Sequence, residues 1–399
     1  MTSDSFPGPK PVPQDVPPPA AAAQQPPTQF EPEPSLVGHP PPAPWTQVID
    51  RQPFGPYAPV GVWQPQFSPL PALVVQRPDP MPDGPREYQQ MLRGPRYRWW
   101  RPLLAILLAA AIGLPLALLA FLPVVLAAQL VGIPDAFRWS AQEVIDIDNL
   151  GPAGFLYVNL SLIVLIVIAG LSVWIAHRIR PRYLSSVQGG LRWGWLLRCV
   201  AVVVPVWVIY LGLGVLVDPT SGPRPQYWGL LLVMVLLLTP LQAAGEEYLF
   251  RGWIMQNVGA WFRHPTVALV VGLTVSVVLF AVAHGSFDIW ILGSLGLFAV
   301  TAGIATWRTG GLEAGIVVHA VNNVGVFFTV IMFGGWEQAF VRSDSASTPL
   351  VFGVDLLVHA VVLTLILWQA KKAGVSRHYR PREGQPPVTA PALAPALET

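Results

Sequence analysis

The segment from Trp228 to Phe250 reads WGLLLVMVLLLTPLQAAGEEYLF, an apolar run that ends in two adjacent carboxylates, Glu246 and Glu247. A helix needs roughly 20 apolar residues to cross the hydrocarbon layer of a membrane, and this run reaches that length. A charged side chain at the centre of such a helix costs about 2.5–3.5 kcal/mol on insertion scales. The segment therefore predicts a membrane helix whose carboxylates have partners or a purpose.

The composition of the whole chain agrees with a membrane protein. Of its 399 residues, 53% are hydrophobic and only 12% are charged, which is too apolar for a soluble protein of this size. The net charge is +2, and the arginines stand at the ends of apolar runs, so we expect no nucleic-acid partner. The single cysteine, Cys199, excludes an internal disulfide and a zinc site built from several cysteines.

Further apolar runs reach or approach the length of a membrane crossing. We therefore expect an all-α fold, a polytopic membrane helical bundle of about eight transmembrane helices. An even number of crossings places both termini on one side of the membrane. The runs are Pro102–Leu130, Ala153–His177, Leu191–Val217, Trp228–Phe250, Val267–His284, Ile289–Trp307, Leu312–Phe333 and Phe352–Ala370.

Basic residues occupy alternate connections between these runs. Arginines are grouped at 93–101, before the first run, and at 178–192, between the second and third runs. Arginines and lysines are grouped again at 371–382, after the last run. Because cytoplasmic connections are enriched in Lys and Arg, we expect a multi-pass protein of the cell membrane with both termini in the cytoplasm.

Both ends of the chain are rich in proline. Proline fixes φ and removes a backbone donor, so we expect disordered tails at residues 1–97 and 373–399 around a membrane domain at 98–372. The N-terminal tail could also dock partner domains through PxxP-like segments, although a plain disordered tail is the simpler interpretation.

Helix geometry separates the roles of the polar residues in the runs. Adjacent helical residues point about 100° apart, so Glu246 and Glu247 cannot both face one cavity. Glu247 precedes Arg251 by four residues on the same face, which suits an internal ion pair and leaves Glu246 free for chemistry. By the same spacing, His319 and Asn323 share a face and can address one point between helices.

The depth of two of these residues can be compared along a hairpin. We expect the fourth helix to continue to about Phe262 and to turn at His264-Pro265. With a rise of about 1.5 Å per residue, Glu246 and His284 are then nearly equidistant from the turn and would meet at one level.

At these residues the chain resembles the CAAX protease and bacteriocin-processing family of intramembrane endopeptidases, also called the Abi family. The resemblance covers residues 228–333 and implies a transmembrane protease domain. Each element alone is weak, but together and in order, each in a membrane run, they are a strong signal. The elements are Glu-Glu-x-x-x-Arg at Glu246, Glu247 and Arg251, Phe-x-x-x-His at Phe280 and His284, and His-x-x-x-Asn at His319 and Asn323.

The resemblance also implies a mechanism. Glu246 and His284 would activate a water for attack on a peptide carbonyl of a membrane-associated protein or peptide. His319 and Asn323 would donate hydrogen bonds to the developing oxyanion. Arg251 would hold Glu247 in place.

The resemblance leaves the need for a metal open. Glu246, His284 and His319 would form the two-His, one-carboxylate set of zinc hydrolases, with water in the fourth position. The chain has no His-Glu-x-x-His motif, however, and the family is described both as metalloproteases and as metal-independent glutamate proteases. We favour the form without metal.

Other interpretations compete at each position. Glu247 and Arg251 could belong to a purely structural ion-pair network, and Asn322 fits a helix-bridging amide. Asp355 and His359 form a further i, i+4 pair, which we interpret as structural and near the outer interface, with a proton relay as the alternative.

Two other functions remain open for the whole chain. A proton-coupled transporter would use intramembrane Glu and His residues, but it predicts duplicated halves, and no second Glu-Glu-x-x-x-Arg element precedes residue 220. A non-catalytic protein for bacteriocin immunity or scaffolding is the other alternative. The excess of arginine over lysine hints at a GC-rich bacterial genome, which disfavours a prenylated substrate.

Overall fold

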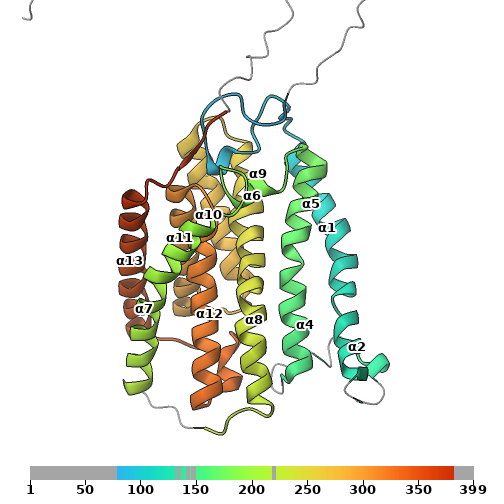
Figure 1. Ribbon diagram of the computed structural model, residues 1–399, viewed down its shortest axis with the longest axis vertical. Coiled ribbons are helices and arrows are strands. Elements are labelled where there is room, and N and C mark those ends of the chain that lie inside the picture. Colours follow the sequence, from blue (N-terminus) through green and yellow to red (C-terminus); the bar gives the residue numbers. More distant parts are fainter. Residues whose placement is uncertain are drawn as a thin grey trace, which may run out of the picture. The chain divides into compact units, whose positions relative to one another are not determined.

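The computed structural model describes residues 79–130, 132, 136–140, 144, 150–217 and 222–381. Figure 1 shows that the described chain is a bundle of long helices joined at their ends by short segments. The only strands in this described part are one pair of two residues each, so the all-α prediction is confirmed.

Within the described residues, eight helical segments are long and apolar enough to cross a membrane, and they match the eight predicted runs. The first and second are each built from two helices, and the fourth continues through a π-helix. The segments are α1 (Arg101–Leu119) with α2 (Leu122–Leu130), α4 (Pro152–Ile163) with α5 (Leu165–His177), α7 (Trp193–Val217), α8 (Trp228–Glu247) with the π-helix η4 (Tyr248–Ile254) and α9 (Met255–Ala260), α10 (Pro265–Ala283), α11 (Ile289–Thr309), α12 (Glu313–Phe333) and α13 (Pro349–Lys372).

Local sequence explains where several of these helices begin and end. Pro265 stands in the first turn of α10, where its missing N–H breaks no hydrogen bond, and this confirms the predicted turn at His264-Pro265. Asp288 caps α11, because its carboxylate accepts hydrogen bonds from the backbone N–H groups of Trp290 and Ile291 at 3.0 and 2.9 Å. Gly310 ends α11 at φ 68°, a conformation that favours glycine.

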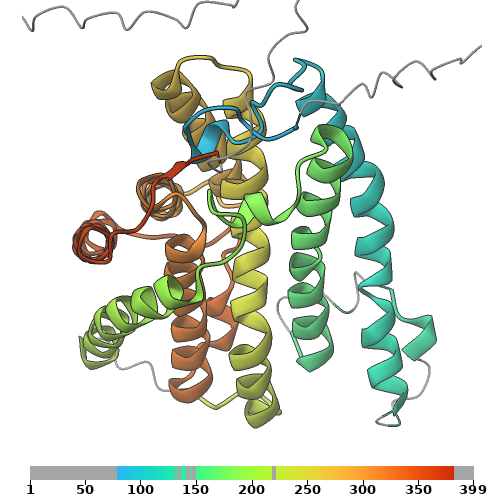
Figure 2. The same ribbon diagram turned by 45° about the horizontal axis from the view of Figure 1, so that its top comes forward.

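Helices α8 and α12 pack against each other and link the remaining helices. The second membrane crossing lies against α8, whereas α7 lies against α12 (Figures 1 and 2). Helix α11 contacts α10, α12 and α13. This arrangement brings the polar residues of α8, α10, α12 and α13 toward the interior of the bundle.

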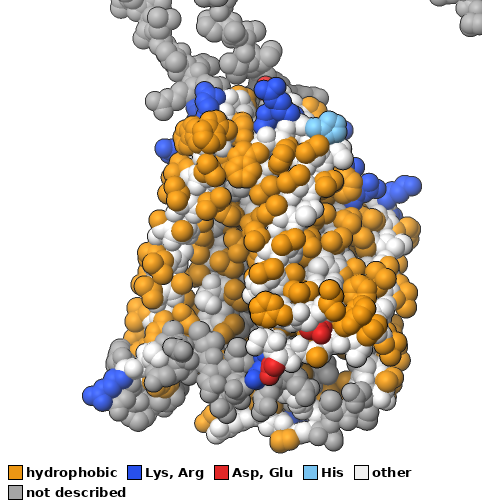
Figure 3. Space-filling view, turned by 180° about the vertical axis from the view of Figure 1, so that it is seen from behind, with side chains coloured by type: hydrophobic (Ala, Val, Ile, Leu, Met, Phe, Trp, Pro, Cys, Tyr) orange, Lys and Arg blue, Asp and Glu red, His pale blue; other side chains and the backbone are white. Residues whose placement is uncertain are grey.

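The surface of the bundle is that of a membrane protein. Many large apolar side chains are exposed along the helices, such as Leu107, Leu216 and Leu237. On the face in Figure 3, hydrophobic side chains cover the length of the bundle and charged side chains lie toward its two ends. An apolar surface of this extent is stable in contact with the hydrocarbon of a lipid bilayer, so the chain is a multi-pass membrane protein.

A glycine permits a close approach beside the two carboxylates. A Cβ atom at Gly245 would lie 2.0 Å from the carbonyl oxygen of Leu162, so α8 touches the backbone of α4 there. Small residues of this kind allow membrane helices to pack backbone to backbone. Gly245 therefore places the start of the Glu-Glu-x-x-x-Arg element directly against the second crossing.

Replacing Gly245 by alanine tests this close approach. We expect Gly245→Ala to lower the free energy of unfolding by about 1–3 kcal/mol, because the two backbones must separate. Gly229→Ala on the same helix is the matched control, since no atom lies within 4 Å of its added Cβ. Thermal unfolding in nanodiscs compares the variants, and equal stabilities would contradict the packing of α8 on α4.

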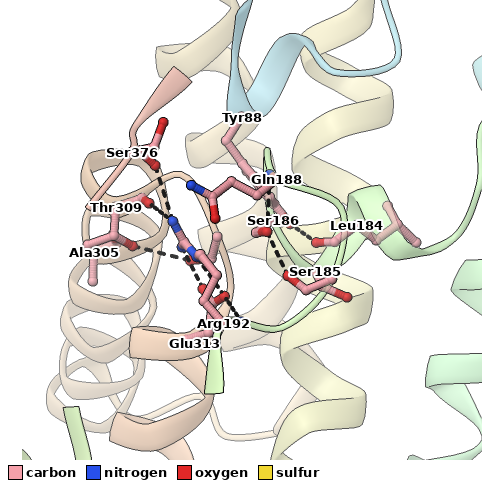
Figure 4. A network of polar contacts seen from close by, with 12 residues as sticks. Tyr88, Leu184, Ser185, Ser186, Gln188, Arg192, Ala305, Thr309, Glu313 and Ser376 are labelled. Carbon is pink, nitrogen blue, oxygen red and sulfur yellow. Dashed lines mark hydrogen bonds and ion pairs between the residues drawn. The ribbon is translucent and has the colours of Figure 1, made fainter. Parts of the chain in front are cut away.

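One end of the bundle is held by the side chain of Arg192 (Figure 4). Its guanidinium donates to both carboxylate oxygens of Glu313, at 2.8 and 2.7 Å. It also donates to the backbone carbonyls of Thr309 and Ser376, at 2.9 and 3.1 Å. A bidentate pair of this kind is among the strongest side-chain contacts, and here it joins α12 to the segment after α13.

The segments on either side of the membrane helices also belong to this folded end. Strand β1 (Arg86–Glu87) pairs antiparallel with β2 (His378–Tyr379), and the 3-10 helix η1 (Tyr88–Gln90) follows β1. Tyr88 is fully buried, and its hydroxyl donates to the carbonyl of Leu184 (Figure 4). The folded domain therefore begins before residue 98 and ends beyond residue 372. The rest of the predicted tails, residues 1–78 and 382–399, lies outside the described residues.

The carboxylate of Glu87 joins these two segments to α11. It forms an ion pair with Arg377 and accepts a hydrogen bond from the indole of Trp307 at 3.1 Å. Burial alone would raise the pKa of Glu87. The hydrogen bonds from Gln89 and Trp307 and the charges of Arg377 and His378 outweigh this effect, so its pKa lies below the ordinary value of 4.5.

A pH series tests the contribution of Glu87 to stability. Because its pKa is lower in the folded state, its contribution is complete above pH 4.5 and is lost as the pH falls through the folded value. We expect Glu87→Gln to cost about 1 kcal/mol at neutral pH, a charged hydrogen bond reduced by solvent screening. The difference from wild type should close in acid. Asp344→Asn, in an exposed ion pair, is the control, and a difference for Glu87→Gln that persists at low pH would contradict the assignment.

Candidate active site

The polar residues of the fourth crossing lie where its helix widens. Helix α8 ends at Glu247, and the π-helix η4 (Tyr248–Ile254) follows it and carries Arg251. Short π-helical turns within longer helices are frequent at functional sites, because they re-aim side chains that a regular helix would hold apart. The Glu-Glu-x-x-x-Arg element therefore spans the junction between two helix types.

Glu247 joins two membrane crossings through one carboxylate oxygen. Its Oε1 accepts hydrogen bonds from Arg251 at 2.8 Å and from Nδ1–H of His319 at 2.9 Å. All three side chains are buried, and Glu247 and Arg251 are completely so. A Cβ at Gly315 would lie 2.9 Å from the other oxygen, Oε2, so this glycine of α12 leaves room for the carboxylate. The ion pair expected from the spacing is present, and His319 is an additional partner.

Arg251 is stabilised by rings as well as by the carboxylate. Its guanidinium lies 4.4 Å from the centre of the Phe280 ring and 5.9 Å from that of Phe298. Two of its nitrogens, Nε and one Nη, have no hydrogen-bond partner among the described residues. The faces of aromatic rings attract such a cation, so these contacts partly replace the missing hydrogen bonds. They also connect η4 to α10 and α11.

The carboxylate of Glu246 has different partners from that of Glu247. It accepts a hydrogen bond from the Gln242 amide and lies 3.8 Å from Nε2 of His319, measured from its Oε2. Gln242 in turn accepts a hydrogen bond from Asn323 at 3.2 Å. Within the described chain Glu246 has no arginine or lysine partner. Its carboxylate is therefore held in place by an amide, and the His319 imidazole is its ion-pair neighbour.

His284 lies at the C-terminal end of α10 and is partly exposed. Its Nδ1 is 2.8 Å from the backbone carbonyl of Phe280. Because a carbonyl only accepts, Nδ1 carries the proton, and Nε2 of the neutral ring has a free lone pair. The ring centre is 4.7 Å from that of Phe280, which fixes its orientation. His284 thus offers an accepting nitrogen.

A cavity of about 160 Å³ lies between these elements. Three of the predicted site residues line it, namely His284, His319 and Asn323. Glu246 is 7% exposed and borders the cavity through its contacts with His319 and Gln242 rather than in its wall. The volume is several times that of one water molecule, which occupies about 30 Å³ in the liquid. The remaining lining residues are Trp207, Tyr210, Phe280, Ser294, Leu295, Phe298, Asn322, Asp355, Val358 and His359.

The structure brings most of the predicted site together, with contacts that spacing alone did not show. His319 donates to Glu247, whereas Asn323 donates to Gln242 and accepts from Asn322, so both side chains already have protein partners. Gln242 was missed, although its position one helical turn before Glu246 in an apolar run was a usable signal. Asp355 and His359, interpreted from the sequence as a pair apart from the site, line the same cavity.

The residues proposed as zinc ligands do not assemble a metal site. Among the described residues, no group of three or more His, Cys, Asp or Glu side chains could hold a metal ion. Zinc ligands lie about 2.0–2.3 Å from the ion, which requires three donor atoms around one point. Glu246 and His319 come within 3.8 Å, but His284 completes no such group with them. We therefore derive no step through a metal.

Comparison with known proteins places this site in a family. Residues 228–325 match the family model of the Rce1-like type II CAAX prenyl endopeptidases. These residues form a CAAX protease domain. The uncharacterized protein YyaK of Bacillus subtilis (strain 168) is 28% identical over 153 residues, which are 36% of this chain and 50% of YyaK. The chain thus spans about half of that relative, and no solved structure matches it.

The CAAX protease domain runs from the start of α8 into α12 and contains all three sequence elements. At the level of the family, the match supports a hydrolase of the CAAX protease type at these residues. The cavity extends beyond the domain, since Tyr210 of α7 and His359 of α13 line it from outside the matched residues.

Removing the cation of the buried ion pair tests how the site is held. Arg251→Met leaves the carboxylate of Glu247 buried with the hydrogen bond from His319 as its remaining side-chain contact among the described residues. We expect a loss of about 3–5 kcal/mol in the free energy of unfolding, as for other broken buried pairs. Thermal unfolding of Arg251→Met and of the double variant Glu247→Leu/Arg251→Met measures it. The double variant should be the more stable, and a mild effect of Arg251→Met alone would refute this role.

Proposed function

We propose that this protein is an intramembrane endopeptidase that cleaves a membrane-associated protein or peptide in the cavity between α10, α12 and α13. The observation that carries this proposal is the grouping of His284, His319 and Asn323 around one cavity inside the membrane-spanning bundle, with Glu246 next to it, 3.8 Å from His319. Polar side chains at this depth are costly unless they serve a purpose. Hydrolysis needs a base, an oxyanion site and a water. The cavity has room for a water, His319 and Asn323 line it as candidate oxyanion donors, and Glu246 lies beside it as the base.

Glu246 and His284 activate the water. Nε2 of His284 accepts one hydrogen bond from it, because Nδ1–H is held by the carbonyl of Phe280. The carboxylate of Glu246, oriented by Gln242, takes a proton as the water oxygen attacks the peptide carbonyl. The C–N bond then breaks, and the same proton passes from Glu246 to the leaving amine. The protons balance without another donor.

His319 and Asn323 receive the negative charge of the oxyanion. Glu247 accepts the Nδ1–H of His319 and so orients the ring, and the donor to the oxyanion in this proposal is the N–H at Nε2. The amide of Asn323 has two N–H bonds and uses one on Gln242. The second is available for the oxyanion. Donors fixed in advance stabilise the transition state more than mobile water does.

We also propose that the protein lies in the cell membrane with both termini on the cytoplasmic side. The pairing of β1 with β2 brings the segments before α1 and after α13 to the same end of the bundle. Arg93, Arg96 and Arg98 precede α1, and Arg377 and Arg380 follow α13, so this end is rich in basic residues. That charge distribution is typical of the cytoplasmic side.

Cleavage of membrane-tethered peptides by purified protein tests the proposed function. We expect Glu246→Gln and His284→Gln each to reduce kcat by about 10²–10⁴, the usual contribution of a positioned acid or base. His378→Gln, which changes an exposed histidine outside the bundle, should retain wild-type cleavage. Folding is checked by thermal unfolding. Equal cleavage by wild type and both site variants would end the proposal.

Treatment with a strong chelator tests the mechanism without a metal. We expect wild-type cleavage to be unchanged after dialysis against the chelator, since Glu246 supplies the base and His319 and Asn323 the oxyanion site. A metal assay of the dialysed protein accompanies the rate measurement. Loss of cleavage that returns on addition of Zn²⁺ would overturn this mechanism and leave the assignment as a peptidase intact.

A further inference from the structure

The cavity has a second polar wall that the proposed mechanism does not use. Asp355 and His359 stand one helical turn apart on α13 and both line the cavity. They lie outside the residues that match the CAAX protease family model. A carboxylate and an imidazole on a membrane helix are expensive to keep, so their position in the cavity requires an explanation.

Asp355 is fixed by two hydroxyl groups from two other helices. One carboxylate oxygen accepts a hydrogen bond from Tyr210 of α7 at 2.9 Å, and the other accepts one from Ser294 of α11 at 2.6 Å. Both oxygens are thus engaged, and three helices meet at this carboxylate. Asp355 therefore acts as an anchor for this part of α13.

His359 is different, because no hydrogen bond to its ring is present among the described residues. The residue is 7% exposed, and its Nδ1 is completely buried without a partner among the described residues. Nε2 is not among the buried unpaired atoms, so it is the nitrogen that the cavity can reach. An unpaired N–H buried at Nδ1 would cost more than an unpaired lone pair, which places the proton on Nε2. His359 thus offers an unused N–H donor.

Contacts between aromatic rings hold His359 near His319 in the wall of the cavity. The ring of Phe298 makes edge-on contacts with two imidazoles. Its centre lies 5.7 Å from that of His359 and 4.9 Å from that of His319. Trp207 contacts His359 at 5.8 Å. The two imidazoles therefore share one phenylalanine and face one cavity.

A peptide in this cavity needs such a donor. Backbone carbonyls leave their hydration water when a substrate enters the membrane interior, and each one without a new partner costs several kcal/mol. His319 and Asn323 serve the carbonyl that is attacked. The carbonyl of a neighbouring residue has no partner in that set, and His359 is a free donor in the described wall of the cavity.

We propose that His359 is a substrate-binding residue whose Nε2–H donates to a backbone carbonyl next to the scissile peptide, with Asp355 as the residue that positions its helix. This inference rests on the proposed endopeptidase function. A proton relay through Asp355 and His359 is the rival, and it needs an exchanging partner at Asp355, whose oxygens are both occupied by hydroxyl donors.

Kinetics of His359 variants separate the two roles. His359→Phe keeps the ring packing but removes the donor, and we expect KM to rise roughly 5- to 10-fold with kcat nearly unchanged, as one lost hydrogen bond predicts. His359→Gln restores an N–H and should return KM toward wild type. Thr364→Ala, at an exposed position on α13, is the control. A fall in kcat with constant KM and an altered pH profile would establish the relay and overturn the proposal.

A binding measurement keeps this inference distinct from the proposed function. A fluorescent lipid-anchored peptide panel is titrated into nanodiscs that hold Glu246→Gln, with and without His359→Phe. Weaker binding caused by His359→Phe supports the subsite, even if the wild type cleaves no peptide and the endopeptidase proposal fails. Equal binding with and without His359→Phe overturns the proposed subsite. If the wild type still cleaves the peptides, the endopeptidase proposal stands. A panel that is neither bound nor cleaved removes both.

Discussion

One carboxylate oxygen in the middle of the bundle organises the site. Oε1 of Glu247 receives hydrogen bonds from Arg251 of η4 and from His319 of α12, and all three groups are shielded from water. A single unpaired charge in such surroundings would cost several kcal/mol, so removing any one of the three side chains destabilises the other two. Because they come from two crossings, their contact fixes how α8 and η4 meet α12.

The contact of Glu247 with Arg251 and His319 gives the two adjacent glutamates different roles. Glu247 is bound to a cation and orients a histidine, whereas Glu246 is oriented by an amide and forms no ion pair with an arginine or lysine among the described residues. The same carboxylate that fixes His319 also sets which of its nitrogens faces the cavity. Structure and chemistry are therefore coupled at Glu247, although it is not placed in contact with substrate. The aromatic rings of Phe280 and Phe298 extend this order to His284 and His359.

Much of the fold follows from the sequence, because hydrocarbon imposes a simple length and polarity rule. The membrane crossings, the turn at His264-Pro265 and the pair of Glu247 with Arg251 all depend on local spacing. The contact of His319 with Glu247 depends on helix tilt and depth, which spacing does not contain. The place of His359 in the cavity depends on how α13 packs against α11, a contact between helices that sequence periodicity does not specify.

The account is tested most directly by a double-mutant cycle on Glu247 and His319. Stabilities of Glu247→Gln, His319→Gln and the double variant are measured by unfolding in nanodiscs. The shared hydrogen bond predicts a coupling free energy of about 1–3 kcal/mol between the two positions. Strictly additive effects would show that the two side chains do not interact across the crossings, and the site as described would then be untenable.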